Sequence, residues 1–319
     1  MANSITRQLL LDEALRRGWS VETIGPHAQL CKITTTAGES EMFSGSRPMR
    51  SAANGRLISV YKNLTLAFVE SLGYEVPAYG IIDTLDEGRQ FLERYKKVVI
   101  KPIDGSQSKG VTVGVTACDQ LVIALHIAQE QSVSGRVIIQ NQIEGKLYRI
   151  FVLNGTVPVV TERRAAQVVG DGAATIRQLV ERLNKDPKRG DGSDTPLKRV
   201  KLSAVETYLG AESLLWVPAE REVVRISDIE SVSAGGDAVN VTDRAHQSWC
   251  ETACRITKEM GLFLAGFDIM CSDIAQPVKG AYLPLLEINS SPGLKIHEYP
   301  SVGSSVRLAP LIFDALFMQ

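Results

Sequence analysis

The sequence carries almost no excess charge of either sign, since 35 Lys and Arg residues stand against 36 Asp and Glu residues in 319. Proteins that hold nucleic acid through its phosphates need a basic face, so this balance argues against a nucleic-acid partner. Aromatic residues make up only 6%, too few for a platform on which bases stack. No apolar run reaches the roughly 18 residues that span a bilayer, and charges interrupt the N-terminal apolar stretch. Neither a membrane partner nor a secretory signal is expected.

Cysteine is scarce and shows no paired pattern. There are five cysteines, an odd number without a C-x-x-C pair, in a chain of ordinary size. A disulfide framework is therefore not expected, and a reducing compartment, the cytoplasm, is. Cys250 and Cys254 have helical spacing, but no Cys or His pair at ligand spacing completes a zinc site, and the four histidines are scattered.

Helical and strand patterns are mixed along the chain. Apolar spacing predicts helices over residues 4–17, 57–72, 121–131, 245–260 and 305–317. Short apolar or alternating runs predict strands over 98–100, 111–115, 137–139, 266–270 and 283–289. Asn154-Gly155, between two further strands, is a strong hairpin signal. The mixture predicts an α/β (α+β) fold with a largely antiparallel component.

A polar, glycine-containing segment joins the strands at 98–100 and 111–115. Gly105 and Gly110 have the spacing that opens a P-loop, but neither the Lys-Ser/Thr pair nor a helix follows, so that motif is excluded. Such a loop can lay its N–H groups over a polyphosphate as a flap, although an ordinary hairpin loop has the same pattern. Lys101 ends the first strand at the mouth of this loop, where it either reaches solvent or binds phosphate. Lys62 lies in the predicted helix, where most lysines are simply solvated.

Carboxylates in the C-terminal strands give the sharpest signal. Glu287 and Asn289 are two apart on one strand and leave the same face. Asp268 lies inside the apolar run GFDIM, and a carboxylate there is costly unless it is paired or binds a cation. Two carboxylates and an amide oxygen form a hard oxygen site suited to Mg²⁺. The alternative, a strand face turned to solvent, is disfavoured because Leu285 on that face is apolar.

Two further segments suit an anionic reaction. Arg163 and Arg164 follow the hairpin, where an arginine can stabilise charge on a transferring phosphoryl or acyl phosphate group. The stretch from Ser231 through Ser233 to Gly236 offers hydroxyl and backbone N–H groups for an anion, although it is also compatible with an ordinary loop. No Ser-His-Asp pattern and no nucleophilic cysteine is evident.

Taken in order, these segments resemble the ATP-grasp superfamily of carboxylate–amine ligases. The resemblance rests on Lys62 and on the segments VVIKPIDGSQSKGVTVGV, YRIFVLNGTVPVV, GFDIM and LLEINSSPG. It is stronger toward the ligase domain of cyanophycin synthetase and that of bifunctional glutathione synthetases, through residues 170–192, 232–243 and 287–303. It covers nearly the whole chain.

The resemblance implies an ATP-grasp fold in which a small central lobe and a larger C-terminal lobe with mainly antiparallel sheet hold the nucleotide. It implies an N-terminal lobe over 1–75, a central lobe with the flap over 76–145 and a C-terminal lobe over 146–319. It also implies roles for individual residues: phosphate contacts from Lys62 and Lys101, a flap containing Gly105, Ser106 and Gly110, an adenine-contacting linker from Gln140 to Ile143, reaction-centre arginines at Arg149 and Arg163, substrate contacts from Ser233, Gly235 and Gly236, and metal ligands at Asp268, Glu287 and Asn289.

The chain departs from the family pattern at several positions. The hinge has Gln140 where Glu is usual, Leu147 stands where an acidic ribose ligand is usual, and Ser108 replaces the middle flap glycine. Ala165 replaces a proline after the reaction-centre arginine, and Ser231 replaces an asparagine. These changes bear on nucleotide binding and leave the metal ligands and lysines intact.

The resulting expectation is an ATP-dependent ligase that forms an amide or peptide bond between amino acids or short peptides through an acyl phosphate. The expected cofactors are ATP and Mg²⁺, with Mn²⁺ as a possible substitute. The expected partners are small-molecule substrates. The resemblance also implies homo-oligomers. Two alternatives stay open: a phosphotransferase with a stable phosphorylated product, and a nucleotide-binding module without turnover, which the Gln140 and Leu147 departures favour.

Overall fold

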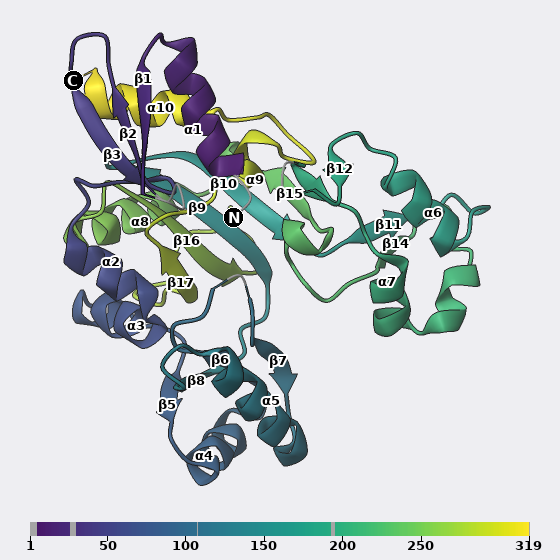
Figure 1. Ribbon diagram of the computed structural model, residues 1–319. Coiled ribbons are helices and arrows are strands. Elements are labelled where there is room, and N and C mark those ends of the chain that lie inside the picture. The colour runs from purple at the N-terminus through teal and green to yellow at the C-terminus, as the bar shows by residue number, and fades with distance from the viewer. Residues whose placement is uncertain (1–4, 26–29, 107, 193–194, 319) are drawn as a thin grey trace.

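The computed structural model describes residues 5–25, 30–106, 108–192 and 195–318. Its centre is a five-stranded sheet in the order β15-β10-β9-β16-β17, in which every neighbouring pair is antiparallel (Figure 1). The strands are β9 (Lys146–Leu153), β10 (Thr156–Arg164), β15 (Asp237–Asn240), β16 (Leu264–Cys271) and β17 (Leu285–Asn289). The predicted α/β class with a mainly antiparallel sheet is confirmed.

The hairpin between β9 and β10 forms where the sequence predicts it. Asn154 has φ 45° and Gly155 has φ 79°, the left-handed pair that a tight hairpin turn requires. Seven consecutive residues of β9 are buried, so both faces of this strand are covered. The helix α8 (Gln247–Glu259) contributes Trp249 and Ile256 to the core on one face. The opposite face packs against the two ends of the chain.

The N-terminal segment forms a sheet that the sequence patterns did not reveal. Four antiparallel strands follow helix α1 (Ile5–Arg16): β1 (Ser20–Ile24), β2 (Leu30–Thr34), β3 (Ser40–Ser44) and β4 (Arg47–Pro48). The C-terminal helix α10 (Leu308–Phe317) lies beside α1, and the two share one apolar core with the central sheet (Figure 1). The expected N-cap at Ser4 lies outside the described residues.

The single helix expected over 57–72 is wrong, because the chain breaks it into α2 (Ala53–Val60) and α3 (Lys62–Ser71). Tyr61 between them is extended, with φ −99° and ψ 115°. The backbone N–H of Lys62 donates to the carbonyl oxygen of Ile103 at 3.0 Å instead of to an earlier turn of helix. The break therefore places Lys62 at the first position of α3, next to the segment that follows β6.

Helix α2 packs closely on the end of α8 through Gly55. A Cβ atom at this position would lie 2.1 Å from the carbonyl oxygen of Met260. We expect Gly55→Ala to lower the free energy of unfolding by about 1–3 kcal/mol through overpacking, although helix propensity alone favours alanine by about 1 kcal/mol. Urea titration measures this loss. The exposed neighbour Asn54→Ala is the control and should be neutral, and an equally stable Gly55→Ala protein would contradict the packing.

A second antiparallel sheet follows α3, in the order β5-β8-β6-β7. Its strands are β5 (Tyr79–Ile82), β6 (Val98–Pro102), β7 (Thr112–Val115) and β8 (Val137–Asn141), and its helices are α4 (Leu85–Tyr95) and α5 (Cys118–Gln131). A capping box of Thr84 and Glu87 begins α4. The glycine-containing loop joins β6 to β7, as the sequence predicts.

Residues between β10 and β15 form a separate cluster with its own apolar core (Figure 1). It contains β11 (Gln167–Val169) paired with β14 (Val223–Arg225), α6 (Ile176–Leu183), the short parallel pair β12 (Arg189–Gly190) and β13 (Leu197–Lys198), α7 (Leu202–Leu209) and a 3₁₀ helix (Ala211–Leu215). We refer to residues 166–226 as the inserted segment. The described part of the chain also contains the short helices Val232–Ala234, Thr242–Arg244 and α9 (Lys295–Glu298).

All five cysteines are free, as expected. Among the described residues, the helices are too short or too polar to cross a bilayer. The three-lobe division at residues 75 and 145 stays a prediction.

Candidate active site

Four strands of the central sheet bring charged side chains into one row. In the strand register, Asp268 on β16 lies opposite Glu287 on β17 on one side and opposite Arg149 on β9 on the other. Arg149 in turn lies opposite Thr161 on β10, and Arg163 is two residues further along that strand. Since alternate residues of a strand share a face, these charged groups project from the same side of the sheet.

The centre of the row is a buried ion-pair cluster. Asp268 is 4% exposed and Arg149 is 9% exposed. Nε and Nη2, on one edge of the Arg149 guanidinium group, both donate to this carboxylate, with Nη2 2.6 Å from Oδ2, and Nη1 of Arg163 lies 3.2 Å from the same oxygen. Burial by itself raises the pKa of Asp268, but the charges of Arg149 and Arg163 outweigh it, so the pKa lies below its usual value. Asp268 is therefore a carboxylate at neutral pH.

Glu287 and Asn289 extend the row at the edge strand. The Asn289 amide donates to Oε1 of Glu287 at 3.1 Å, so the two side chains share a face as the sequence predicts. Glu287 also acts electrostatically on Lys62, Lys101 and both arginines: burial lowers the pKa of Lys62, Lys101 and Arg163, and the charge of Glu287 opposes this lowering, while for Arg149 it adds to the effect of Asp268, which raises the pKa despite burial. Its carboxylate therefore interacts electrostatically with four positively charged side chains.

The predicted metal ligands form a hard oxygen set that fits a divalent cation. Asp268 and Glu287 face each other on adjacent strands, and Asn289 supplies an amide oxygen. The described part of the chain holds no group of three or more His, Cys, Asp or Glu side chains able to bind a metal, so a cation held by Asp268 and Glu287 would also need the amide oxygen of Asn289. The arginines contact both oxygens of Asp268, so such a cation would have to share one of these oxygens with them.

Two buried lysines lie beside the carboxylate row. Nζ of Lys62 donates to the carbonyl oxygen of Gly105 at 2.5 Å, and Nζ of Lys101 donates to Oε1 of Gln140 at 2.5 Å. They are only 7% and 5% exposed. Burial lowers the pKa of Lys62, and burial together with the charge of Lys62 lowers the pKa of Lys101 to about 8. Neither lysine has the solvated environment that is usual for a lysine.

The predicted adenine linker has one side chain turned toward the lysines. Gln140 is buried and connects Lys101 to the carbonyl oxygen of Leu285, which its amide reaches at 3.4 Å. This contact joins the second sheet to β17 of the central sheet. Ile143 lies in the connection between β8 and β9. No local pattern predicts that Gln140 is a partner of Lys101, because the two are distant along the chain.

The flap loop is anchored at one end by a residue that sequence reasoning missed. Asp104 accepts hydrogen bonds from the Ser132 hydroxyl and from the backbone N–H groups of Val133 and Ser134. Ser106 is exposed, Gly110 has φ 70°, and Gln107 between them lies outside the described residues. Ser108 has φ 58°, so this residue adopts the conformation that glycine adopts most easily.

The glycine loop before β15 uses two backbone N–H groups internally. The N–H of Gly235 donates to the carbonyl oxygen of Val232 at 3.3 Å, and that of Gly236 to the carbonyl oxygen of Ser231 at 3.0 Å. The substrate contacts expected from Ser233, Gly235 and Gly236 stay a prediction. Gly236 is required for packing, since a Cβ would lie 2.3 Å from the Arg164 carbonyl oxygen. The Ser233 side chain is outside the described part of the structure.

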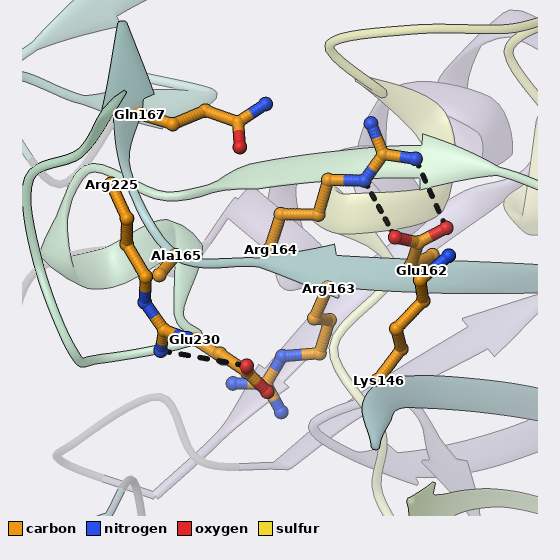
Figure 2. A pocket seen from close by; sticks show the side chains of 8 residues that line it. All are labelled: Lys146, Glu162, Arg163, Arg164, Ala165, Gln167, Arg225 and Glu230. Atoms are coloured by element: carbon orange, nitrogen blue, oxygen red, sulfur yellow. Dashed lines mark hydrogen bonds and ion pairs between the residues drawn. The ribbon is translucent and has the colours of Figure 1, made fainter. Parts of the chain in front are cut away.

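A polar cavity of about 250 Å³ adjoins the row where β10 meets the inserted segment (Figure 2). Arg163 and Arg164 lie on opposite faces of β10, and Arg164 pairs with Glu162 at 2.6 Å. Across the cavity Arg225 pairs with Glu230 at 3.6 Å. Burial raises the pKa of Glu230 despite the opposing charges of Arg225 and Arg163. The lining residues are Lys146, Glu162, Arg163, Arg164, Ala165, Gln167, Arg225 and Glu230.

His297 is a further buried polar residue, and it lies beside the charged row through its contact with Thr161. Its Nδ1 lies 2.8 Å from the Thr161 hydroxyl, and its ring packs edge-on against Phe151. Burial and the Arg149 charge lower its pKa to about 3, so the ring is neutral at physiological pH. No local pattern around residues 295–301 predicts this contact.

Comparison with known proteins places this geometry in context. No family model matches the chain. Cyanophycin synthetase from Trichormus variabilis is 32% identical over 262 residues, which are 80% of this chain and 29% of that protein. The bifunctional glutathione biosynthesis protein from Pasteurella multocida is 29% identical over 325 residues, covering 99% of this chain and 43% of that protein. The chain thus spans less than half the length of the curated relatives it matches.

The fold comparison agrees with the sequence comparison. The crystal structure of a bifunctional glutathione synthetase from Pasteurella multocida matches 99% of this chain and 43% of its own length, with a TM-score of 0.75 and 28% identity. The similarities in sequence and in fold together confirm the resemblance drawn from the sequence. The chain thus has the fold of the ATP-grasp ligases and is similar in sequence to cyanophycin synthetase and to the bifunctional glutathione biosynthesis protein.

Proposed function

We propose that this protein is an ATP-dependent carboxylate–amine ligase that joins amino acids or short peptides. The observation that carries the proposal is the row Arg163, Arg149, Asp268 and Glu287, with the buried amines of Lys62 and Lys101 beside it. Buried lysines with lowered pKa values, next to a hard oxygen set, suit an anionic polyphosphate and its cation. The relatives named above are synthetases, which supports a bond-forming reaction.

In the proposed first step, a substrate carboxylate oxygen attacks the γ-phosphorus of ATP. The bond between that phosphorus and the β–γ bridging oxygen breaks, and ADP leaves. Lys62 and Lys101 hold the phosphates, and the flap with Gly105, Ser106 and Gly110 covers them. Asp268, Glu287 and Asn289 would hold Mg²⁺ or Mn²⁺, which supplies charge neutralisation at the phosphates when bound.

In the second step, the substrate amine attacks the acyl carbon, inorganic phosphate leaves, and the amine loses a proton. In this proposal Arg149 and Arg163 stabilise the negative charge that develops on oxygen. The linker from Gln140 to Ile143 is proposed to contact adenine through its backbone, since the Gln140 side chain is engaged by Lys101. A cytoplasmic location and homo-oligomers are part of the same proposal.

The test is to incubate the protein with ATP, Mg²⁺ and pooled amino acids, and to measure phosphate release and new amide masses together. We expect release that depends on the amine and yields the mass of a condensed product. ADP with a stable phosphorylated product would identify a phosphotransferase instead. Calorimetric binding of a non-hydrolysable ATP analogue without any turnover would identify a nucleotide-binding module.

The lowered pKa of Lys101 predicts a pH limit for nucleotide binding. With a pKa of about 8, Lys101 loses its proton in the free protein as the pH rises from 7 to 9, and with it the charge that attracts phosphate. We expect the affinity for ATP to fall by about tenfold between pH 8 and 9.5, where the charged fraction drops from about one half to a few per cent. Calorimetry over this range measures it, and Lys101→Arg should remove the dependence because arginine stays charged.

The lowered pKa of Lys101 affects the stability of the fold in the opposite direction, since stability increases with pH where ATP affinity decreases. The unfolded chain keeps the Lys101 proton up to about pH 10.5, whereas the folded chain releases it near pH 8. The unfolded state therefore binds more protons between these values, and the contribution of this group to stability increases as the pH rises through that window. Weaker ATP binding in that window accordingly cannot be ascribed to Lys101-driven unfolding.

A further inference from the structure

The charged row has two different ends, which follow from the strand order of the central sheet. At one end Glu287 on β17 acts electrostatically on the buried amines of Lys62 and Lys101. Arg163 on β10 is the other end, with β9 and β16 between them. The polar cavity of about 250 Å³ lies at this second end, because Arg163 is one of its lining residues (Figure 2). The cavity is therefore at the end of the row away from the proposed phosphate contacts.

The second step of the proposed reaction needs an amine at a place that the nucleotide does not fill. The end of the row away from the lysines meets this requirement. At neutral pH the amine of an amino acid or peptide is mostly an ammonium group, which has no lone pair with which to attack a carbon atom. The site that receives it therefore has to bind a cation and accept a proton from it.

Glu230 is the carboxylate of the cavity lining that can take this role. The other lining carboxylate, Glu162, is held by Arg164 through two contacts of 2.6 and 3.1 Å. Glu230 lies 3.6 Å from Arg225, beyond hydrogen-bond distance, and within the described ranges no hydrogen bond to its carboxylate is recorded. Burial raises the pKa of Glu230 despite the charges of Arg225 and Arg163, and Glu162 adds to the rise. A raised pKa makes this carboxylate a stronger proton acceptor than an ordinary glutamate.

The turn before Glu230 orders the segment that carries this carboxylate. Arg225, at the end of β14, donates from Nε to the carbonyl oxygen of Ser227 at 2.8 Å and from Nη2 to that of Asp228 at 3.0 Å. The N–H of Ile229 donates to the Ser227 hydroxyl at 3.1 Å. Because the Arg225 guanidinium group is engaged by these carbonyl oxygens, it orders the turn and pairs with Glu230 only loosely. The Glu230 carboxylate thus lines the cavity without a tightly bound cation of the chain itself.

We infer that Glu230 binds the ammonium group of the amine substrate in this cavity and accepts a proton from it. This inference rests on the proposed function and assigns the base of its second step. One proton moves from the ammonium nitrogen to a Glu230 oxygen, and the freed lone pair attacks the acyl carbon. The bond between that carbon and the phosphate oxygen breaks, the phosphate takes the second proton of the nitrogen and leaves as hydrogen phosphate, and Glu230 returns its proton to water.

Hydroxylamine separates this role from the steps that precede it. It is largely uncharged at neutral pH, so it converts an acyl phosphate to a hydroxamate without the help of a base. We expect Glu230→Gln to lower kcat/KM for the amine substrate by at least about 100-fold, the scale of a lost general base, and to change hydroxamate formation by less than about threefold. Glu230→Asp keeps a carboxylate and should retain part of the rate. Glu181→Gln, exposed on α6, is the matched control and should behave as the unmodified protein.

The two products, measured by mass in the same assay with ATP, Mg²⁺ and pooled amino acids, distinguish the outcomes. Equal losses of amide and hydroxamate in the Glu230→Gln protein overturn the inference, because Glu230 would then act before the amine does or support the fold. Unchanged amide formation overturns it as well. If the unmodified protein forms neither product, no acyl phosphate is made and the proposed function fails.

A binding measurement decides the ammonium site independently of turnover. Amino-acid carboxamides carry an ammonium group and no carboxylate, so ligand-observed NMR of a carboxamide pool reports on a cation site. We expect the unmodified and Glu181→Gln proteins to bind members of the pool, and the Glu230→Gln protein to bind them at least about tenfold more weakly, as for a lost hydrogen bond to a charged group. No binding by the unmodified protein, or equal binding by the Glu230→Gln protein, overturns the inference.

Discussion

The Glu287→Gln substitution is expected to lower ATP-dependent phosphate release by about 100- to 1,000-fold with little change in fold, because preorganised charge at a phosphoryl-transfer centre contributes on this scale. Glutamine keeps the side-chain oxygen that Asn289 contacts at 3.1 Å, but it removes the charge that acts on Lys62, Lys101 and both arginines. It also removes one of the two carboxylates of the proposed metal set.

Phosphate release measured over a range of Mg²⁺ concentrations checks this expectation. The matched control is Glu93→Gln, an exposed glutamate on α4 that lies outside the charged row. We expect the control to retain full activity and the Glu287→Gln protein to stay folded by circular dichroism. A Glu287→Gln protein that releases phosphate at the normal rate would refute the assigned role of this carboxylate.

The Asp268→Asn substitution is expected to reduce the free energy of unfolding by about 3–5 kcal/mol, as when one partner of a buried ion pair is removed. The amide leaves Arg149 and Arg163 buried with no carboxylate at the position that both contact. Asparagine is nearly the same size, so the loss is electrostatic and not caused by a cavity. Activity should be lost as well, because the row is then disrupted at its centre.

Urea unfolding of Asp268→Asn measures this loss against an exposed ion pair. Asp86 pairs with Arg89 at 3.0 Å on α4, and Asp86→Asn should cost less than about 1 kcal/mol. The pH dependence gives a second check. Since the folded pKa of Asp268 is lowered, its stabilisation is present above the ordinary aspartate pKa and is lost as the pH falls. The substituted protein should lack that acid-dependent part, and similar losses for the two variants would contradict the cluster.

Local patterns were sufficient to predict four strands of the central sheet, but not its edge strand β15 or the N-terminal sheet. The β9–β10 hairpin has a left-handed Asn-Gly turn, and β16 and β17 are apolar runs around single acidic residues, so each was recognisable from a few neighbours. Strand β1 shows no alternation, since three of its five residues are exposed and none is buried. Its stability comes from pairing with β2, which is a tertiary effect. The break at Tyr61 likewise depends on a contact with Ile103 that no local pattern contains.

The candidate site likewise has some features that local patterns predict and others that depend on tertiary contacts. The shared face of Glu287 and Asn289 follows from strand periodicity, and the structure brings Asp268 and the two arginines to the same face. The engagement of Asp268 by Arg149, of Lys101 by Gln140 and of Lys62 by Gly105 depends on strand order and on the approach of separate sheets. The glycine loop shows the opposite case, because residue types suited to an anion are there used for close packing.

The packing of α1 against α10 has a consequence for how the chain is made. Glu13 on α1 is in contact with Arg307 at 3.2 Å, a partner 294 residues away, and Arg17 pairs with Asp314 at 2.7 Å. At translation rates of about 5–20 residues per second, the first helix waits roughly 15–60 s on the ribosome before its partner is synthesised. During that interval the apolar side of α1 is uncovered and open to chaperones, because the core that α1 shares with α10 closes only after α10 has been made.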